Sequence, residues 1–258
     1  MSDYTSNKIA MITGATAGIG KATAEKFAKL GYSLILTARR SDLLNEISNF
    51  LMQMYGIKIY KMELDVRDKD EVEKQIQAMP EAWKKINILV NNAGLAVGLN
   101  PIYEGVIDDW ERMIDTNIKG LLYVSRAIMP LMIANGYGHI INIGSIAGRE
   151  AYQNGNVYCG TKAAVDAITK GMRIDLLKHG IKVTLIEPGA VETEFSVVRF
   201  KGDQERADNV YKGFTPLKAE DIADAIYYVA SLPEHVNIND MLIVPTAQAA
   251  ATIIDKKL

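Results

Sequence analysis

Near its N-terminus the chain reads Thr13-Gly14-Ala15-Thr16-Ala17-Gly18-Ile19-Gly20, directly after the apolar run 8–13. Apolar residues at helical spacing follow over 19–30, so we predict a strand, a glycine-rich turn and a helix. Glycines at such a turn let the backbone approach a pyrophosphate at the positive end of the helix. The spacing is G-x-x-x-G-x-G, and a tight joint without a ligand is the alternative. We predict a dinucleotide site with contacts from Gly14, Gly18, Ile19 and Gly20.

Beyond this turn, short β-branched runs alternate with long helical patterns. Strands are predicted at 8–13, 33–37, 57–62, 86–90, 139–143, 182–186 and near 241–244. Helices are predicted near 19–30, 42–55, 69–78, 110–135, 158–179 and 220–231. This alternation is typical of a parallel sheet buried on both faces. We therefore predict an α/β fold, in which residues 1–258 form a single Rossmann-like, doubly wound domain with helices on both faces.

The composition limits the class of protein. The 258 residues are 48% hydrophobic and 23% charged, and the formal net charge is −2, as in soluble globular proteins. A single cysteine excludes an intrachain disulfide, and three scattered histidines argue against a metal site. No signal-like stretch, long apolar run or Lys/Arg-rich block is present. We predict a cytoplasmic protein with no nucleic-acid or membrane partner.

The residues after the second and third predicted strands indicate which nucleotide binds. An NAD site usually places a carboxylate after the second strand, but here the chain carries Arg39 and Arg40. Guanidinium groups bind a 2′-phosphate, so we predict NADP(H); a solvated pair that opens the next helix is the alternative. Asp65 and Val66 follow the third strand and are predicted to contact the adenine. Alternatively, Asp65 caps the helix that begins near Asp68.

Three polar residues lie at the spacing of a proton-transfer site. Ser145 follows the strand predicted at 139–143, and Tyr158 precedes Lys162 by four residues on a predicted helix. The last two share a helical face, about 6 Å apart along the axis. A nearby ammonium lowers the pKa of a tyrosine from its reference value of about 10, and a serine hydroxyl can donate to the reacting oxygen. The alternative is an exposed pair on an amphipathic helix.

Taken together, the motifs resemble the short-chain dehydrogenase/reductase family, in the same order and over almost the whole chain. They are Thr13-Gly14-x-x-x-Gly18-x-Gly20, Asn91-Asn92-Ala93-Gly94, Asn117, Ser145, Tyr158-x-x-x-Lys162 and Pro188-Gly189. The resemblance implies a Rossmann domain that carries its own catalytic site on a seven-stranded sheet. It also implies a homotetramer, built on the two long helices that hold Asn117 and Tyr158.

The same resemblance implies a role for each polar residue. Tyr158 would be the acid/base, and Ser145 would polarise the substrate carbonyl. Lys162 would hold the nicotinamide ribose and tune Tyr158, while Asn117 would anchor a water in the proton relay. Cys159, which neighbours Tyr158, is predicted to be a small buried side chain because it points about 100° away on the helix. Further implied cofactor contacts are Asn91, Ala93, Gly94, Pro188, Gly189, Val191 and Thr193; alternatively, the Asn-Asn-Ala-Gly run only ends a strand.

A narrower resemblance concerns the segments 145–152, 192–202 and 237–239. They are similar to the NADP-dependent 3-hydroxy acid dehydrogenases, which oxidise serine-type and 3-hydroxypropionate-type acids or reduce the corresponding semialdehydes. The resemblance implies an NADPH-dependent oxidoreductase acting on a short acidic aldehyde and its 3-hydroxy acid. Alternatives are a sulfoacetaldehyde reductase that forms isethionate and a non-catalytic NADP(H) sensor. Such sensors typically lose the Tyr or the Lys, and this chain keeps both.

The substrate anion requires a receptor on the far side of the reacting carbonyl. Residues 192–215 have a weak pattern with aromatic and charged side chains, and we predict that they form a substrate lid. Candidates to bind the anion are Arg149 and Arg199, with the Tyr152 hydroxyl nearby. A guanidinium binds a carboxylate or a sulfonate equally well, so both substrate classes remain open. Alternatively, Arg149 has a structural partner and Arg199 is solvated.

Overall fold

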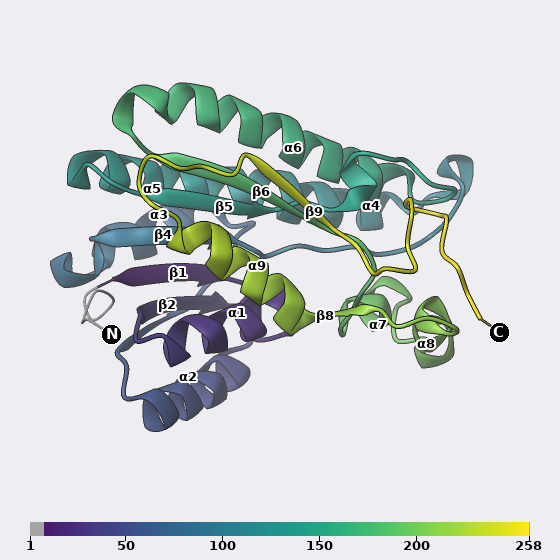
Figure 1. Ribbon diagram of the computed structural model, residues 1–258, viewed down its shortest axis with the longest axis horizontal. Coiled ribbons are helices and arrows are strands. Elements are labelled where there is room, and N and C mark those ends of the chain that lie inside the picture. Colours follow the sequence, from purple (N-terminus) through teal and green to yellow (C-terminus); the bar gives the residue numbers. More distant parts are fainter. Residues whose placement is uncertain (1–7, 258) are drawn as a thin grey trace.

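The computed structural model describes residues 8–257, and a seven-stranded sheet forms its centre (Figure 1). The strands are β1 (Ile9–Thr13), β2 (Ser33–Ala38), β3 (Ile59–Glu63), β4 (Ile86–Asn91), β5 (His139–Ile143), β6 (Lys182–Pro188) and β9 (Asp240–Ile243). Their order is β3-β2-β1-β4-β5-β6-β9, and every neighbouring pair is parallel. The predicted doubly wound sheet is confirmed. Because the order reverses between β1 and β4, a crevice for a ligand lies at their carboxyl ends.

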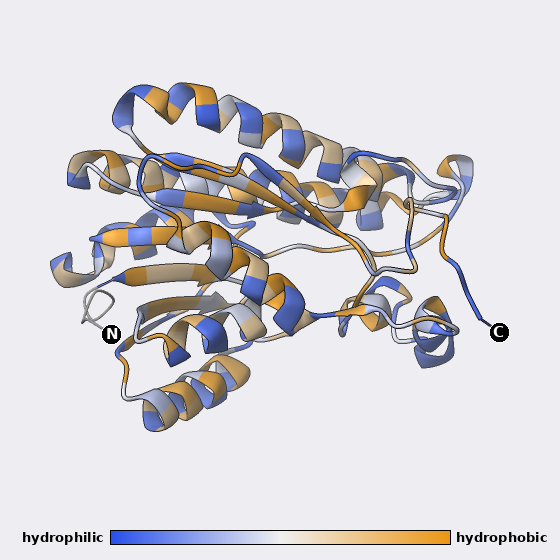
Figure 2. Cartoon of the chain, viewed as in Figure 1, coloured by the Kyte–Doolittle hydropathy of each residue, from blue (hydrophilic) through white to orange (hydrophobic). Residues whose placement is uncertain are grey.

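Helices cover both faces of the sheet. One apolar core lies beneath α1 (Gly18–Lys29), α2 (Ser41–Tyr55) and α9 (Ala219–Ser231). The other lies beneath α3 (Lys69–Ala78), α5 (Leu121–Asn135) and α6 (Asn156–Leu176). Figure 2 shows apolar strands between helices that carry both polar and apolar residues, the pattern of a sheet buried on two sides. No helix within residues 8–257 is long and apolar enough to cross a membrane.

The helix predicted over 110–135 is interrupted in the structure. It consists of α4 (Ile107–Ile114), a π-helical turn (Asp115–Gly120) and α5. The π turn adds a residue to the helix, and π turns frequently mark functional sites. Asn117 lies within it, and its side chain bonds to the main chain of Leu95. The other predicted strands and helices begin and end within a few residues of the observed ones.

The segment 192–215, predicted as a weakly patterned lid, contains regular structure. Helix α7 (Phe195–Arg199) and helix α8 (Gln204–Tyr211) lie between two short strands, β7 (Val191–Glu192) and β8 (Leu217–Lys218), which pair in parallel. In Figure 1 these helices lie beyond one end of the sheet, apart from the two helix layers. Asp203 caps α8 by accepting from the Arg206 amide at 3.0 Å. The function of the segment as a lid remains a prediction.

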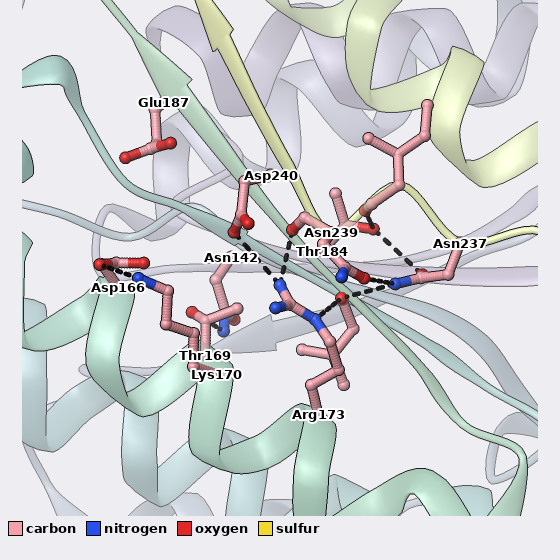
Figure 3. A network of polar contacts seen from close by, with 12 residues as sticks. Asn142, Asp166, Thr169, Lys170, Arg173, Thr184, Glu187, Asn237, Asn239 and Asp240 are labelled. Atoms are coloured by element: carbon pink, nitrogen blue, oxygen red, sulfur yellow. Dashed lines mark hydrogen bonds and ion pairs between the residues drawn. The ribbon is translucent and has the colours of Figure 1, made fainter.

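The last strand is held to the sheet by the polar network in Figure 3. Arg173, on α6, donates to the carbonyl oxygens of Val183 at 3.0 Å and Asn239 at 2.6 Å. It also lies 3.2 Å from the Asp240 carboxylate, at the start of β9. The Asn237 side chain donates to the same Val183 carbonyl. The segment 237–239, which contributed to the narrower resemblance, therefore secures the edge of the sheet.

Candidate active site

The glycine-rich turn forms a backbone cradle at the start of α1. Gly14 and Gly18 have φ angles of +66° and +47°, which side-chain-bearing residues rarely adopt. A Cβ atom on Gly20 would lie 2.2 Å from the Gly14 carbonyl oxygen, so only glycine fits there. Gly20 was predicted to contact the cofactor, but it packs against the turn and is not among the residues that line the cavity at the carboxyl ends of the strands. The helix has no side-chain cap and no acidic residue in its first turn. Its first amide groups therefore suit a phosphate, as the sequence predicts.

A cavity of about 400 Å³ opens at the carboxyl ends of the strands, a volume typical of small-molecule sites. The predicted residues that line it are Gly14, Gly18, Ile19, Arg39, Arg40, Asp65, Val66, Ala93, Gly94, Ser145, Tyr158, Lys162, Pro188, Gly189, Val191 and Thr193. Unpredicted residues that also line it include Thr16, Asn92, Phe195 and Val198. Within residues 8–257, no cluster of His, Cys, Asp or Glu side chains could hold a metal ion.

Asn91, expected to contact the cofactor, lies beneath the cavity instead. Its amide donates to the Ser125 hydroxyl and the Asn142 side chain, both at 2.8 Å, between the buried strands. The neighbouring Asn92 lines the cavity and donates to the carbonyl oxygens of Thr13 at 2.9 Å and Gly14 at 3.2 Å. Alternating side-chain directions along a strand explain why the two asparagines differ. Asn92 braces the glycine turn, which the sequence analysis did not predict.

Two arginines and two carboxylates lie at the end of the cavity that is predicted to bind the 2′-phosphate. The Arg39 guanidinium lies 3.9 Å from Asp65, and that of Arg40 lies 3.9 Å from Glu194. Partial burial raises the pKa of Asp65, but bonds from Arg67 outweigh this effect and lower it. Arg67 binds the Asp65 carboxylate at 3.0 and 2.6 Å. Because Arg67 already balances the negative charge of Asp65, Arg39 remains available to bind an anion.

The alternative role of Asp65 as a helix cap is wrong. Asp68 is the N-cap of α3, since its carboxylate accepts from the Glu71 amide at 3.0 Å. Asp65 lines the cavity beside Val66. Arg67, its main partner, escaped the sequence analysis because nothing in the local pattern distinguishes it from a solvated charge.

Ser145, Tyr158 and Lys162 meet on one wall of the cavity. Ser145 lies just after β5, where its hydroxyl accepts from the Ala147 amide at 3.1 Å and donates to the Pro188 carbonyl at 3.4 Å. Lys162 donates to the Ile143 carbonyl at 2.8 Å, and its Nζ lies 6.0 Å from the centre of the Tyr158 ring. Tyr158 and Lys162 are both buried. The helical spacing therefore gives the predicted juxtaposition.

Burial controls the ionisation of this group. It lowers the pKa of Lys162 to about 8. Burial also raises the pKa of Tyr158 above its usual value, assisted by Tyr152 and opposed by the Ser145 hydroxyl and the Arg199 charge. The prediction of a lowered tyrosine pKa is therefore wrong for this structure, because desolvation of the phenolate outweighs nearby positive charge. Tyr158 is neutral and carries a proton that it can donate.

Asn117 is buried behind the catalytic wall and bonds fully to the protein. Its oxygen accepts from the Leu95 amide at 2.7 Å, and its amide donates to the Leu95 carbonyl at 2.8 Å and to the Thr161 hydroxyl at 3.0 Å. It thereby ties the π turn to α6 and to the loop after β4. Its role in anchoring a water remains a prediction.

Arg199 lies over the aromatic rings of the site. Its guanidinium carbon is 5.5 Å from the centre of the Tyr158 ring and 5.3 Å from that of Tyr152. Its Nε and one Nη atom are buried and have no hydrogen-bond partner among residues 8–257. Phe195, also on α7, lies 5.9 Å from Tyr158, ring centre to ring centre. A buried guanidinium with unused donors is a strong receptor for an anion.

Arg149, the other candidate receptor, has a different environment. Both its Nε and one Nη atom bond to the carboxylate of Glu187, the former at 2.8 Å. Glu187 is buried on β6. Arg149, Tyr152 and Arg199 are all absent from the residues that line the cavity, so the partners of the two guanidiniums, and not the cavity wall, distinguish the two arginines. The structure favours the alternative for Arg149, namely a structural partner.

The segment 245–257 adds contacts that no motif predicted. The Gln248 oxygen accepts from the Ala190 amide at 2.9 Å, directly after Pro188-Gly189. A Cβ atom on Gly189 would lie 2.4 Å from that oxygen, which explains the glycine. Lys256 donates to the carbonyl oxygens of Asn209 at 3.4 Å and Val210 at 3.1 Å, near the end of α8. One segment thus contacts both the cofactor side of the cavity and α8.

Comparison with known proteins identifies similar chains. A family model described as short chain dehydrogenase matches residues 8–204. The NADP-dependent 3-hydroxy acid dehydrogenase YdfG of Salmonella typhi is 46% identical over 244 residues, covering 94% of this chain and 97% of that protein. Sulfoacetaldehyde reductase 2 of Chromohalobacter salexigens is 46% identical over 250 residues, covering 96% and 98%. The closed form of serine dehydrogenase complexed with NADP+ superposes with a TM-score of 0.90 at 44% identity, covering 97% and 100%.

Proposed function

Because the chain belongs to the short-chain dehydrogenase family, we propose that it is an NADP(H)-dependent oxidoreductase. It interconverts a short aldehyde that carries an acidic group and the corresponding 3-hydroxy acid. Relatives of nearly equal length are named for NADP-dependent action on hydroxy acids and on sulfoacetaldehyde. The observation that carries the proposal is the buried guanidinium of Arg199, with unused donors, over the Tyr158 ring.

The cavity suits NADP(H) at both ends. The glycine cradle and the uncapped start of α1 would hold the pyrophosphate, and Arg39 and Arg40 would hold the 2′-phosphate. Pro188 and Thr193 would flank the nicotinamide, and Lys162 would hold its ribose. When bound, NADP(H) exchanges a hydride with the substrate carbon. The predicted NADP(H) preference agrees with the names of the relatives.

Tyr158 and its neighbours handle the proton. Neutral Tyr158 donates its proton to the aldehyde oxygen during reduction and becomes a phenolate; during oxidation the phenolate accepts the proton of the substrate hydroxyl. The Ser145 hydroxyl donates a hydrogen bond to the same oxygen, turning from the Pro188 carbonyl that it now contacts at 3.4 Å. With a pKa near 8, Lys162 remains mostly charged at neutral pH and stabilises the developing phenolate. Since all three residues line one cavity, a non-catalytic sensor is the weaker hypothesis.

Arg199 selects the acidic group. A short substrate whose carbonyl lies beside Tyr158 brings its far end towards the guanidinium above the ring. Carboxylates and sulfonates both accept paired bonds from arginine, so malonic semialdehyde and sulfoacetaldehyde both fit the proposal. The segment 192–215, which carries Arg199, acts as the lid. Closure of such a segment excludes water and strengthens the interaction between the charges.

We also propose a homotetramer in the cytoplasm. Exposed apolar side chains on α5, on α6 and in the 3-10 turn that follows α6 support an interface between copies of the chain: Leu122, Ile174 and Leu177. The lone cysteine, which is buried, is compatible with a reducing compartment.

The decisive experiment measures NADPH oxidation with short aldehydes. The panel contains malonic semialdehyde, succinic semialdehyde, sulfoacetaldehyde and neutral aldehydes of equal size. We expect Arg199→Ala to raise KM for the anionic aldehydes about 10- to 100-fold, the value of a charge-assisted pair, with little change for neutral ones. Arg126→Ala, at an exposed arginine of α5 outside the segment 192–215, is the matched control and should change neither. Equal effects of Arg199→Ala on anionic and neutral aldehydes would contradict the proposal.

A further inference from the structure

Asp109 is a buried carboxylate outside the hydride-transfer site. It lies on α4 with a side chain only 5% exposed, and the Lys201 ammonium binds it at 2.8 Å. The Arg112 guanidinium, on the same helix, is more distant, at 4.0 Å. Lys201 follows α7 directly and is half exposed. A buried charge of this kind requires a close partner, so this ion pair restrains the end of α7.

The main chain reinforces the same connection. The Gly98 amide donates to the carbonyl oxygen of Arg199 at 3.0 Å. Gly98 has a φ of +76°, and a Cβ atom there would lie 2.8 Å from the Asp109 carboxylate. Lys201 adopts a φ of +55°, a left-handed conformation that directs the chain back at the end of the helix. Arg199 is therefore held at its own carbonyl group and, two residues later, through Lys201.

This wall adjoins the reacting group. Gly98, Asp109 and Tyr158 line a small cavity of about 20 Å³, room for one water molecule. The other end of α7 is fixed separately, because the Ser196 hydroxyl bonds to the Tyr211 hydroxyl at 2.7 Å and Tyr211 donates to the Val191 carbonyl. The helix has only five residues, and its further contacts include those of Phe195 and Arg199 with the aromatic rings of the site. Release of one anchor would displace the Arg199 side chain.

We infer that Asp109 and Lys201 form a latch that positions Arg199 over Tyr158 and thereby sets the preference for anionic substrates. The inference rests on the proposed function, since it concerns the same substrate group. Neither residue touches the substrate; both are positioning residues. Their effect on an anionic aldehyde should pass through Arg199, while a neutral aldehyde, which makes no use of the guanidinium, should be affected little.

The test begins with Lys201→Met, which removes the charge but keeps most of the side-chain length. We expect KM for malonic semialdehyde to rise about five- to tenfold, between the effects of exposed and buried ion pairs, with KM for propionaldehyde within twofold. Lys58→Met is the matched control, at an exposed lysine just before β3 and outside the segment 192–215, and should change neither value. Asp109→Asn should reproduce the effect of Lys201→Met. Equal increases for both aldehydes would overturn the latch.

A double substitution gives the sharper result. In the Arg199→Ala background, Lys201→Met should produce no further increase in KM for malonic semialdehyde, because its effect passes through Arg199. If the two substitutions raised KM independently, so that their fold-changes multiplied, the inference would be overturned.

Chymotrypsin provides a readout that does not depend on the substrate. It should cleave Lys201→Met faster than Lys58→Met after Phe195 or Phe200, because a released α7 opens more often. Equal cleavage rates would overturn the latch. A wild type that treats the two aldehydes alike would instead contradict the proposed function, and the cleavage comparison would then decide whether the pair holds α7.

Discussion

The cofactor cradle and the lid are built in different ways. The cradle consists of backbone: the turn after β1 approaches its ligand through glycines, and every residue of β1 is buried. The lid consists of two short helices that depend on side-chain contacts, such as those of Ser196 with Tyr211 and Lys201 with Asp109. A turn that depends on backbone geometry tolerates few substitutions, whereas a single substitution can change one side-chain contact and leave the others in place. We therefore expect the cradle to fix which cofactor class binds and the segment 192–215, our proposed lid, to set which substrate is accepted.

The largest expected effect is a loss of kcat on substitution of Tyr158, where the cradle and the lid meet. Tyr158→Phe removes the transferable proton but leaves the cradle and the lid unchanged. We expect kcat to fall about 10²- to 10⁴-fold, the usual contribution of general acid catalysis, while NADPH binding stays within twofold. Stopped-flow turnover and fluorescence titration of NADPH measure the two quantities. If most of kcat remained, another group would have to supply the proton.

A smaller effect should be confined to the cradle. Arg39→Ala removes a guanidinium that lies 3.9 Å from Asp65 and lines the cavity. We expect kcat/KM with NADPH to fall about 10- to 100-fold, and kcat/KM with NADH to change little, since NADH lacks the 2′-phosphate. Preference for anionic over neutral aldehydes should be unchanged. If Arg39→Ala changed that preference, the cradle and the lid would not act separately on the cofactor and the substrate.

The smallest effect concerns stability and pH. Burial lowers the pKa of Lys162 to about 8 in the folded chain, below the unfolded value near 10.4. Between these values the unfolded chain binds more protons, so the contribution of this lysine to stability rises with pH. Relative to Lys162→Met, the wild type should gain about 2 kcal/mol in free energy of unfolding from pH 8 to pH 10. Urea denaturation at several pH values tests this, and a difference that stays constant would contradict it.

Elements with a strong local pattern could be predicted from the sequence. The strand predicted at 139–143 is β5 (His139–Ile143), and the helix predicted at 69–78 is α3 (Lys69–Ala78). The glycine turn, Tyr158 and Lys162 also lie where their spacing placed them, because each depends on neighbours within a few residues. The helices of the lid were not predicted, since five and eight residues are too few to show a clear period.

Long-range partners explain most of what the sequence analysis missed. Arg149 and Arg199 are both plausible anion receptors in the sequence, and only the pairing of Arg149 with Glu187, 38 positions away, separates them. Gln248 and Asp109 belong to no recognised motif, yet each is buried against the cavity walls or the lid. The raised pKa of Tyr158 likewise follows from burial, which no local pattern reports.

The π turn at Asp115–Gly120 makes the region sensitive to length as well as to composition. Deletion of one residue there would convert the wide turn to ordinary α-helix and leave α4 and α5 nearly in phase. Asn117, which lies within the turn, would then be displaced from Leu95. We therefore expect related chains to differ in this segment by substitution of residues. Deletion of a single residue should not be tolerated, even at positions where substitutions are.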